Sequence, residues 1–180
     1  MIETPRLKLI PATVVLSRAE IGDRAEFARI IEADVPEDWP PASVADALPL
    51  FLQWIEAAPE QVGWFGWYAL AKDNSGNRPV LVASGGFLGP PQNGEVCIGY
   101  SVLPQFQQRG FATELADGLI KWAQRRPDVF CIVAETEWAN PASVRVLSKL
   151  GFVAAGPGSD PAGMRFELSV KPVAKEELPE

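Results

Sequence analysis

The sequence predicts an α/β (α+β) fold with a mixed, mostly antiparallel sheet of about seven strands and about four helices. Two observations support this fold class. Three strands joined by short turns follow one another between residues 64 and 103, as in an antiparallel meander. Residues 95–150 then alternate strand, helix, strand and helix, which makes the sheet mixed. We place a single domain at residues 1–170 and a charged, proline-containing flexible tail at residues 171–180.

The first third of the chain predicts one strand and two helices. Alternation of apolar and polar residues indicates a strand over residues 6–10. Apolar residues on one side predict a helix over residues 23–32, and the proline-rich stretch 35–42 ends it. Helical spacing of apolar residues predicts a second helix over residues 44–57, with Ser43 opening a pattern that resembles a capping box.

The middle of the chain is predicted to form three antiparallel strands joined by short turns. Strands are predicted over residues 64–72, 79–88 and 95–103, with turns at 73–77 and 90–94. Gly85 and Gly86 interrupt the second of these strands and predict a β-bulge there.

The last third adds two helices and three short strands. A helix begins after Ala112, carries Leu115 and Leu119 on one face, and ends before Pro127. Asn140 is a good N-cap for a further helix that runs to Leu150. The remaining strands are predicted over residues 129–134, 152–155 and 164–170.

Charge and composition exclude several classes of function. The chain has 16 basic and 23 acidic residues, a net charge of −7, which argues against a nucleic-acid binder and suits cationic substrates. It contains no histidine, which excludes Ser-His-Asp and Cys-His catalysis and the usual histidine zinc sites, so we expect no metal. Cys97 and Cys131 lie in apolar runs without a CxxC pattern and are expected to be buried thiols of a cytoplasmic protein rather than a disulfide. No signal peptide or membrane-spanning segment is expected.

The loop between the strand at 95–103 and the next helix carries the chemical signal. Gly110 stands directly before the helix, where unpaired backbone N–H groups and the positive end of the helix dipole bind anions. Glycine lets a phosphate approach the backbone closely, and Arg109 adds a positive charge. Neither a Walker loop nor a GxGxxG fingerprint is present, so a phosphate site here would use a single helix end.

Four stretches of the chain resemble one family. Residues 107–112, Gln-Gln-Arg-Gly-Phe-Ala, match the Q/R-x-x-G-x-G/A signature of the GCN5-related N-acetyltransferases (GNAT superfamily). Residues 98–104 resemble the fourth strand of that superfamily, and residues 140–152 resemble its later helix with a Lys-x-Gly-Phe ending. Residues 4–7, Thr-Pro-Arg-Leu, resemble the opening of the branch that contains the ribosomal-protein N-terminal (RimJ/RimL-like) acetyltransferases.

The resemblance implies a fold, a reaction and a set of cofactor contacts. The sheet is expected to splay between its fourth strand, at 95–103, and its fifth, at 129–134, and to admit a thioester there. The implied reaction is acetyl transfer from acetyl-CoA, as co-substrate, to a primary amine of a protein N-terminus or a cationic small molecule. The implied cofactor contacts are Ser101, Val102, Leu103, Gln107, Gln108, Arg109, Gly110, Phe111, Ala112, Thr113, Asn140 and Ser143.

The reaction needs a neutral amine, a donor for the oxyanion and a proton for the departing thiolate. Glu95 is the first candidate for the general base, and a solvent-exposed carboxylate without a catalytic role is an equally good interpretation of it. Glu135 and Glu137 are alternative candidates for the base. Tyr100 is the candidate acid, with packing in the strand as its alternative role. The sequence departs from the family at Cys97, where many relatives have a glutamate, and also at the position of the family's general-acid tyrosine.

Leu147 occupies the position at which many relatives have the tyrosine that acts as general acid. Because Cys97 and Leu147 replace residues that often transfer protons, a catalytically silent acyl-CoA-binding or regulatory module is an alternative function. A protein-interaction domain is a third hypothesis. The six tryptophans either pack in the core or wall an acceptor pocket. Relatives often pair, so a homodimer is also open, and the sequence does not name the acceptor amine or the acyl-chain preference.

Overall fold

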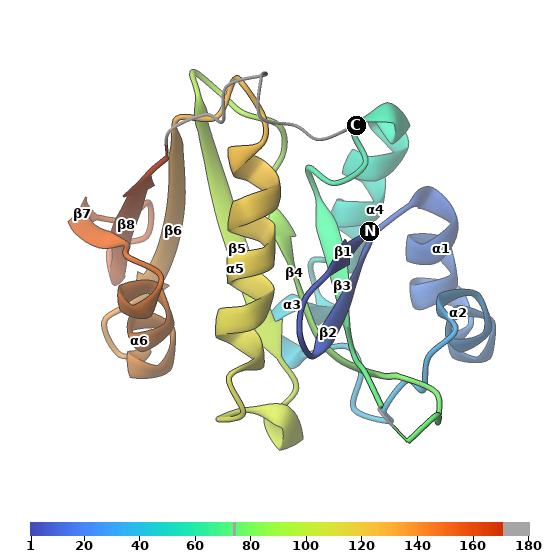
Figure 1. The fold of residues 1–180 in the computed structure, drawn as a ribbon. Helices are drawn as coiled ribbons and strands as arrows, with labels where there is room; N and C mark the ends of the chain where they lie inside the picture. Colours follow the sequence, from blue (N-terminus) through green and yellow to red (C-terminus); the bar gives the residue numbers. More distant parts are fainter. Residues whose placement is uncertain (74, 171–180) are drawn as a thin grey trace.

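The computed structural model describes residues 1–73 and 75–170, and these form one eight-stranded sheet with helices on both faces (Figure 1). The strand order is β1-β2-β3-β4-β5-β6-β8-β7, and every neighbouring pair is antiparallel except β5 and β6. This confirms the predicted fold class. The tail expected at 171–180 lies outside the described residues.

The strands are β1 (Ile2–Glu3), β2 (Leu7–Pro11), β3 (Gly66–Ala71), β4 (Val80–Phe87), β5 (Glu95–Val102), β6 (Cys131–Glu137), β7 (Val153–Pro157) and β8 (Gly163–Ser169). The helices are α1 (Val14–Gly22), α2 (Arg24–Ile31), α3 (Ala42–Ala45), α4 (Leu48–Ala57), α5 (Phe111–Gln124) and α6 (Pro141–Lys149), with short 3-10 turns η1 (Pro59–Gln61) and η2 (Pro104–Phe106).

Two hydrophobic cores lie on opposite faces of the sheet. The first packs α5 and α6 against the strands and includes Leu115, Leu119 and Leu147. The second packs α1, α2 and α4 against the other face and includes Phe27 and Ile55. Figure 1 shows α5 lying along the front of the sheet, with α4 behind it.

The region around α3 and α4 differs from the prediction of a single helix over 44–57. Pro49 stands in the first turn of α4, and since proline has no N–H to donate to the preceding turn, the chain starts a new helix there. The capping-box prediction was also wrong: Ser43 lies inside α3, and the N-cap of α3 is Pro41 without a side-chain hydrogen bond. The Ser43 hydroxyl instead meets the Ser101 hydroxyl of β5 at 2.8 Å.

The bulge predicted at Gly85 and Gly86 is also wrong. The β3–β4 register is regular at both glycines and shifts between Ala69 and Leu70, so that Val82 is the extra residue. The glycines serve a close approach of strands instead. A Cβ on Gly86, where φ is 152°, would lie 2.0 Å from the Phe65 carbonyl oxygen.

Candidate active site

The sheet opens between β5 and β6, as the family resemblance implied. The two strands pair only from Glu95 to Cys97 on β5 and from Cys131 to Val133 on β6. Beyond these residues, among the parts of the chain that the structure describes, β5 continues to Val102 and pairs only with β4, while β6 continues to Glu137 and pairs only with β8. We call this opening the gap.

A loop at one end of the gap presents backbone N–H groups that have no partner among the described residues. We define the anion loop as residues 107–113, which lead from η2 into the first turn of α5. None of its backbone N–H groups from Gln108 to Thr113 has a hydrogen-bond partner among the described residues. Gly110, the N-cap of α5, has a φ of 82°, a conformation that glycine adopts without strain. The exposed donors and the dipole of α5 together suit a phosphate.

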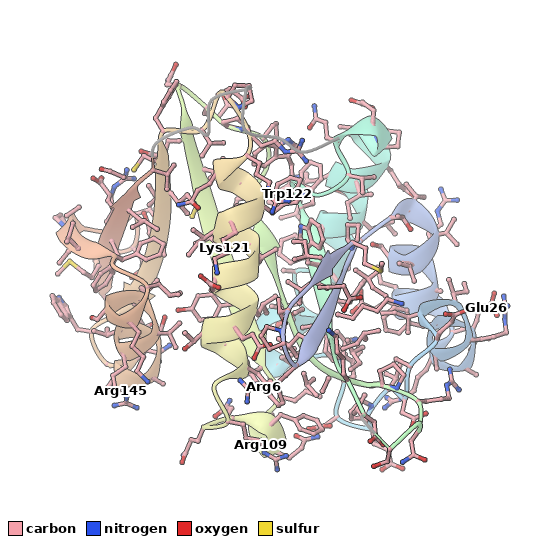
Figure 2. The ribbon with its side chains drawn as sticks, in the orientation of Figure 1. Arg6, Glu26, Arg109, Lys121, Trp122 and Arg145 are labelled. Carbon is pink, nitrogen blue, oxygen red and sulfur yellow. The ribbon has the colours of Figure 1, made fainter. Side chains whose placement is uncertain are left out.

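The N-terminal segment braces the anion loop. Arg6 lies near Arg109 at the start of α5 (Figure 2). Its guanidinium donates to the Arg109 carbonyl oxygen and to the Glu114 carboxylate, each at 2.7 Å, and lies over the Phe111 ring. The Thr4 hydroxyl donates to the same carboxylate at 2.7 Å. Burial raises the pKa of Glu114, but the hydrogen bonds from Thr4 and Arg6 outweigh it and leave the pKa below its ordinary value. The Thr-Pro-Arg-Leu stretch therefore fixes the shape of the loop.

Other residues expected to contact the cofactor are placed around the gap. The Gln107 side-chain amide donates to the Val102 carbonyl oxygen at 3.0 Å and ties the loop to β5. The Arg109 side chain is exposed, with its guanidinium 5.5 Å from the Phe106 ring centre. Leu103 is fully buried, its N–H donates to the Val82 carbonyl oxygen and its own carbonyl oxygen accepts from the Phe106 N–H, so the structure does not offer it to a ligand as the sequence analysis expected.

The far wall of the gap is the start of α6. Asn140 caps this helix by accepting a hydrogen bond from the Ser143 N–H at 3.1 Å. The Ser143 hydroxyl lies 3.3 Å from the Tyr100 hydroxyl of β5, so this pair spans the gap. Burial raises the pKa of Tyr100, which keeps its proton at neutral pH, and the Ser143 hydrogen bond opposes this only in part. Leu147 is 1% exposed and packs in the core.

The carboxylates near the gap are already engaged. Glu95 accepts a hydrogen bond from the Arg165 guanidinium, which also binds Glu167 at 2.8 Å. Glu95 also lies where β5 and β6 still pair, at the closed end of the gap. Glu135 accepts hydrogen bonds from the Ser159 hydroxyl and N–H, which lower its pKa, and Glu137 is exposed.

On the other face of the sheet, a cavity of about 230 Å³ lies between the strands β3–β5 and the helices α1, α3 and α4. Its floor contains three glycines opposite one another in neighbouring strands, Gly66, Gly86 and Gly99, which we call the glycine row. Because the row carries no side chains, the cavity reaches down to the backbone. A Cβ on Gly99 would meet no atom within 4 Å.

Among the described residues that line this cavity, Glu20 of α1 is the only one with an ionisable carboxylate. The Tyr68 hydroxyl donates to it at 2.6 Å and the Trp39 indole N–H at 2.8 Å. Burial raises the pKa of Glu20, and these two hydrogen bonds oppose the rise. The pKa of Tyr68 lies well above its usual value because of burial and the Glu20 charge, so Tyr68 stays neutral.

The sequence analysis missed Glu20 because it did not predict α1. The aromatic residues were the only available signal, since a pocket wall was one of the two roles weighed for the tryptophans. Trp39 binds Glu20 beside the cavity, whereas the side chains of Trp64, Trp67 and Trp122 pack together in the core beside α5.

Comparison with known proteins agrees with this geometry. The family model described as "Acetyltransferase (GNAT) domain" matches residues 13–153. The uncharacterized N-acetyltransferase YjdG of Bacillus subtilis (strain 168) is 30% identical over 154 residues, which cover 85% of this chain and 89% of that protein. The chain therefore belongs to the GNAT family, and it is an acetyltransferase.

Solved structures share the fold at low sequence identity. RimL, a ribosomal alpha-N-protein acetyltransferase in complex with coenzyme A, has a TM-score of 0.60 and 16% identity, over 93% of this chain and 96% of its own. The spermidine/spermine N-acetyltransferase SpeG of Vibrio cholerae has a TM-score of 0.57 and 13% identity, over 91% of this chain and 95% of its own. No helix among residues 1–73 and 75–170 is long and apolar enough to cross a membrane.

Proposed function

We propose that this protein transfers an acetyl group from acetyl-CoA to a primary amine, on a protein N-terminus or a small molecule. The observation that carries the proposal is the position of the anion loop. Its free N–H groups stand at one end of the gap between β5 and β6, and residues 99–101 of β5 also line the cavity on the other face. A cofactor held at the loop and an acceptor held in the cavity would meet at β5.

The residues present fit the phosphate and arm of acetyl-CoA, which supplies the acetyl group as a thioester when bound. The N–H groups of the anion loop would hold the pyrophosphate, with Arg109 nearby as a mobile positive charge. The backbone of β5 at Ser101 and Val102 would meet the pantetheine arm, since this part of β5 has no partner strand on the gap side among the described residues. Leu103 is left out of this set because its N–H and carbonyl oxygen are bonded to Val82 and Phe106. Asn140 and Ser143 would form the opposite wall.

Proton transfer is assigned to two residues of β5. Tyr100 would donate a proton to the leaving thiolate, because burial keeps its hydroxyl protonated and Ser143 orients it across the gap. Glu95 remains the proposed base for the acceptor ammonium. It would act through water, because its carboxylate is held by Arg165 at the closed end of the gap.

The related proteins support a primary amine as acceptor without choosing its kind. RimL is a ribosomal alpha-N-protein acetyltransferase and SpeG a spermidine/spermine acetyltransferase, so protein and small-molecule acceptors both occur on this fold. A cytoplasmic location and a homodimer stay predictions, the first in line with the two free thiols, Cys97 and Cys131.

The test is thermal unfolding with acetyl-CoA, followed by a screen of amines for release of the CoA thiol. Ligand at 100 times its dissociation constant adds about 2.7 kcal/mol, a rise of several degrees in Tm. Gly110→Ala is expected to weaken CoA binding about tenfold, because its Cβ would lie 3.2 Å from the Arg6 Nη2 atom and would disturb the side chain that braces the anion loop.

Gly76→Ala is the matched control. Gly76 has a φ of 85° against 82° for Gly110, so the backbone strain is equal, but Gly76 lies in the turn after β3 with open space around it. Equal CoA affinity of the two variants would show that the anion loop does not hold the cofactor. Tight CoA binding without turnover of any amine would contradict the transferase activity.

A further inference from the structure

The cavity beneath α1, α3 and α4 has a chemical character of its own: an apolar interior with one carboxylate at one end. Building on the proposed function, we propose that the acceptor is an elongated molecule with two amines and an apolar middle. The amine to be acetylated lies at the β5 end of the cavity. The second, positively charged, pairs with Glu20 at the α1 end.

The register of the sheet separates the two ends. Tyr68, Ser84 and Ser101 lie opposite one another in β3, β4 and β5, and all three line the cavity. Neighbouring strands are about 4.8 Å apart, so the row from Tyr68 to Ser101 spans about 10 Å. Glu20 is bonded to the Tyr68 hydroxyl, whereas the gap opens beside Ser101. The Glu20 carboxylate therefore belongs to the end of the cavity away from the reaction.

Among the described residues, Glu20 has no counter-ion, unlike two other carboxylates near the proposed site. Glu114 is paired with Arg6 and Glu95 with Arg165. Glu20 receives hydrogen bonds from the neutral groups of Tyr68 and Trp39, and no described lysine or arginine forms an ion pair with it. A carboxylate removed from water is stabilised by a paired cation. A positively charged ligand group would supply that pair, and burial already raises the pKa of Glu20 in its absence.

The walls between the two ends define the middle of the ligand. Val44 of α3 and Leu48, Phe51 and Ile55 of α4 cover the cavity, and the glycine row forms part of its floor. These walls hold no second carboxylate among the described residues. An ammonium group in the middle of the ligand would lose its water without gaining a counter-ion, which is unfavourable. An alkyl or aryl body fits this part of the cavity.

Three amines of one length test the inference by binding calorimetry in the presence of CoA, without the need for turnover. The first is spermidine. The second is the diamine isostere of spermidine, in which a methylene replaces the central secondary amine. The third is a monoamine, in which a methyl group replaces one terminal amino group of that diamine. We expect the diamine isostere to bind about tenfold more tightly than either of the others. Glu20→Gln should abolish its advantage over the monoamine.

Glu56→Gln is the matched control, because Glu56 is an exposed glutamate of α4 outside the cavity and should leave the preference intact. Gly99→Val fills the β5 end of the cavity and should abolish binding of all three amines, while CoA still stabilises the variant. CoA stabilisation of Glu20→Gln verifies its fold.

Three results would overturn the inference: equal affinity for diamine and monoamine, a preference that survives Glu20→Gln, or tighter binding of spermidine than of its isostere. These outcomes are distinct from failure of the proposed function. Selective diamine binding without acetyl transfer would contradict the transferase proposal alone, whereas acetylation of amines without any dependence on Glu20 would contradict the two-amine acceptor alone.

Discussion

The two faces of strands β3–β5 are built in opposite ways. Toward α5 the strands carry large side chains, such as Trp67, Phe87 and Ile98, which pack in a continuous core. Toward α1, α3 and α4 the neighbouring positions are the glycine row and then small residues such as Ser84. The packed face holds the sheet together, and the bare face leaves room for a ligand. The comparison teaches that this cavity comes from the omission of side chains on three adjacent strands.

The largest expected effect is on the packed face. Trp67 is 2% exposed, and its indole N–H donates to the Gly63 carbonyl oxygen at 2.8 Å. Trp67→Ala should lower the free energy of unfolding by about 3–5 kcal/mol, because it leaves a cavity and an unpaired carbonyl. Urea denaturation measures this. Trp138→Ala, at a position 60% exposed, is the control, with an expected loss within about 1 kcal/mol, and equal losses would contradict the assignment of Trp67 to the core.

A second large effect is expected within the glycine row. Gly86→Ala places a Cβ 2.0 Å from the Phe65 carbonyl oxygen, so the backbone has to move. We expect a loss of about 2–4 kcal/mol, measured by the same denaturation experiment. Wild-type stability in this variant would mean that the strands do not require the close approach.

A smaller, pH-dependent effect is expected where the N-terminal segment meets α5. Glu114→Gln should cost about 1 kcal/mol at pH 7, because it removes the charge from the bonds to Thr4 and Arg6, of which Arg6 is half exposed. The folded pKa of Glu114 is lowered from 4.5, so this stabilisation is complete above 4.5 and is lost as the pH falls through the folded pKa. The difference between wild type and variant should therefore close in acid. A difference that persists at all pH values would assign the effect to packing.

The smallest effect on stability is expected for Gly99→Val. Its Cβ enters open space and valine favours strands, so the free energy of unfolding should change by about 0.5 kcal/mol or less. Acceptor use should nevertheless fall, seen as a higher KM for the amine at an unchanged CoA affinity. An unchanged KM would mean that the acceptor does not occupy this end of the cavity.

Local signals in the sequence were sufficient for most of the sheet and for the anion loop. The helix α6 begins at its expected cap, Asn140, because an N-cap bonds to residues two or three positions away. The helix predicted to start at Asp23 begins one residue later, with Asp23 as its N-cap. Gly110 was identified for the same reason, since a loop and the helix after it are contiguous in the chain. The helix α1 was missed because it packs against both α2 and α4 and has no single apolar stripe.

The cavity depends on contacts that no local pattern contains. Its walls come from α1, α3 and α4 and its floor from β3–β5. The hydrogen bonds that hold the Glu20 carboxylate come from Trp39 and Tyr68, which are 19 and 48 residues away in the sequence. Periodicity alone also joined α3 and α4 into one helix, although the position of Pro49 in the first turn of α4 was visible in the sequence.

The gap gives this sheet an edge in its interior. From Ile98 to Val102, β5 has no neighbouring strand on the side of β6 within residues 1–73 and 75–170, and unpaired strand edges attract strands of other molecules. A bound cofactor would cover this edge, so ligand-free preparations should aggregate on storage sooner than preparations that contain CoA. We therefore expect the solubility of this protein to rise when a ligand occupies the gap.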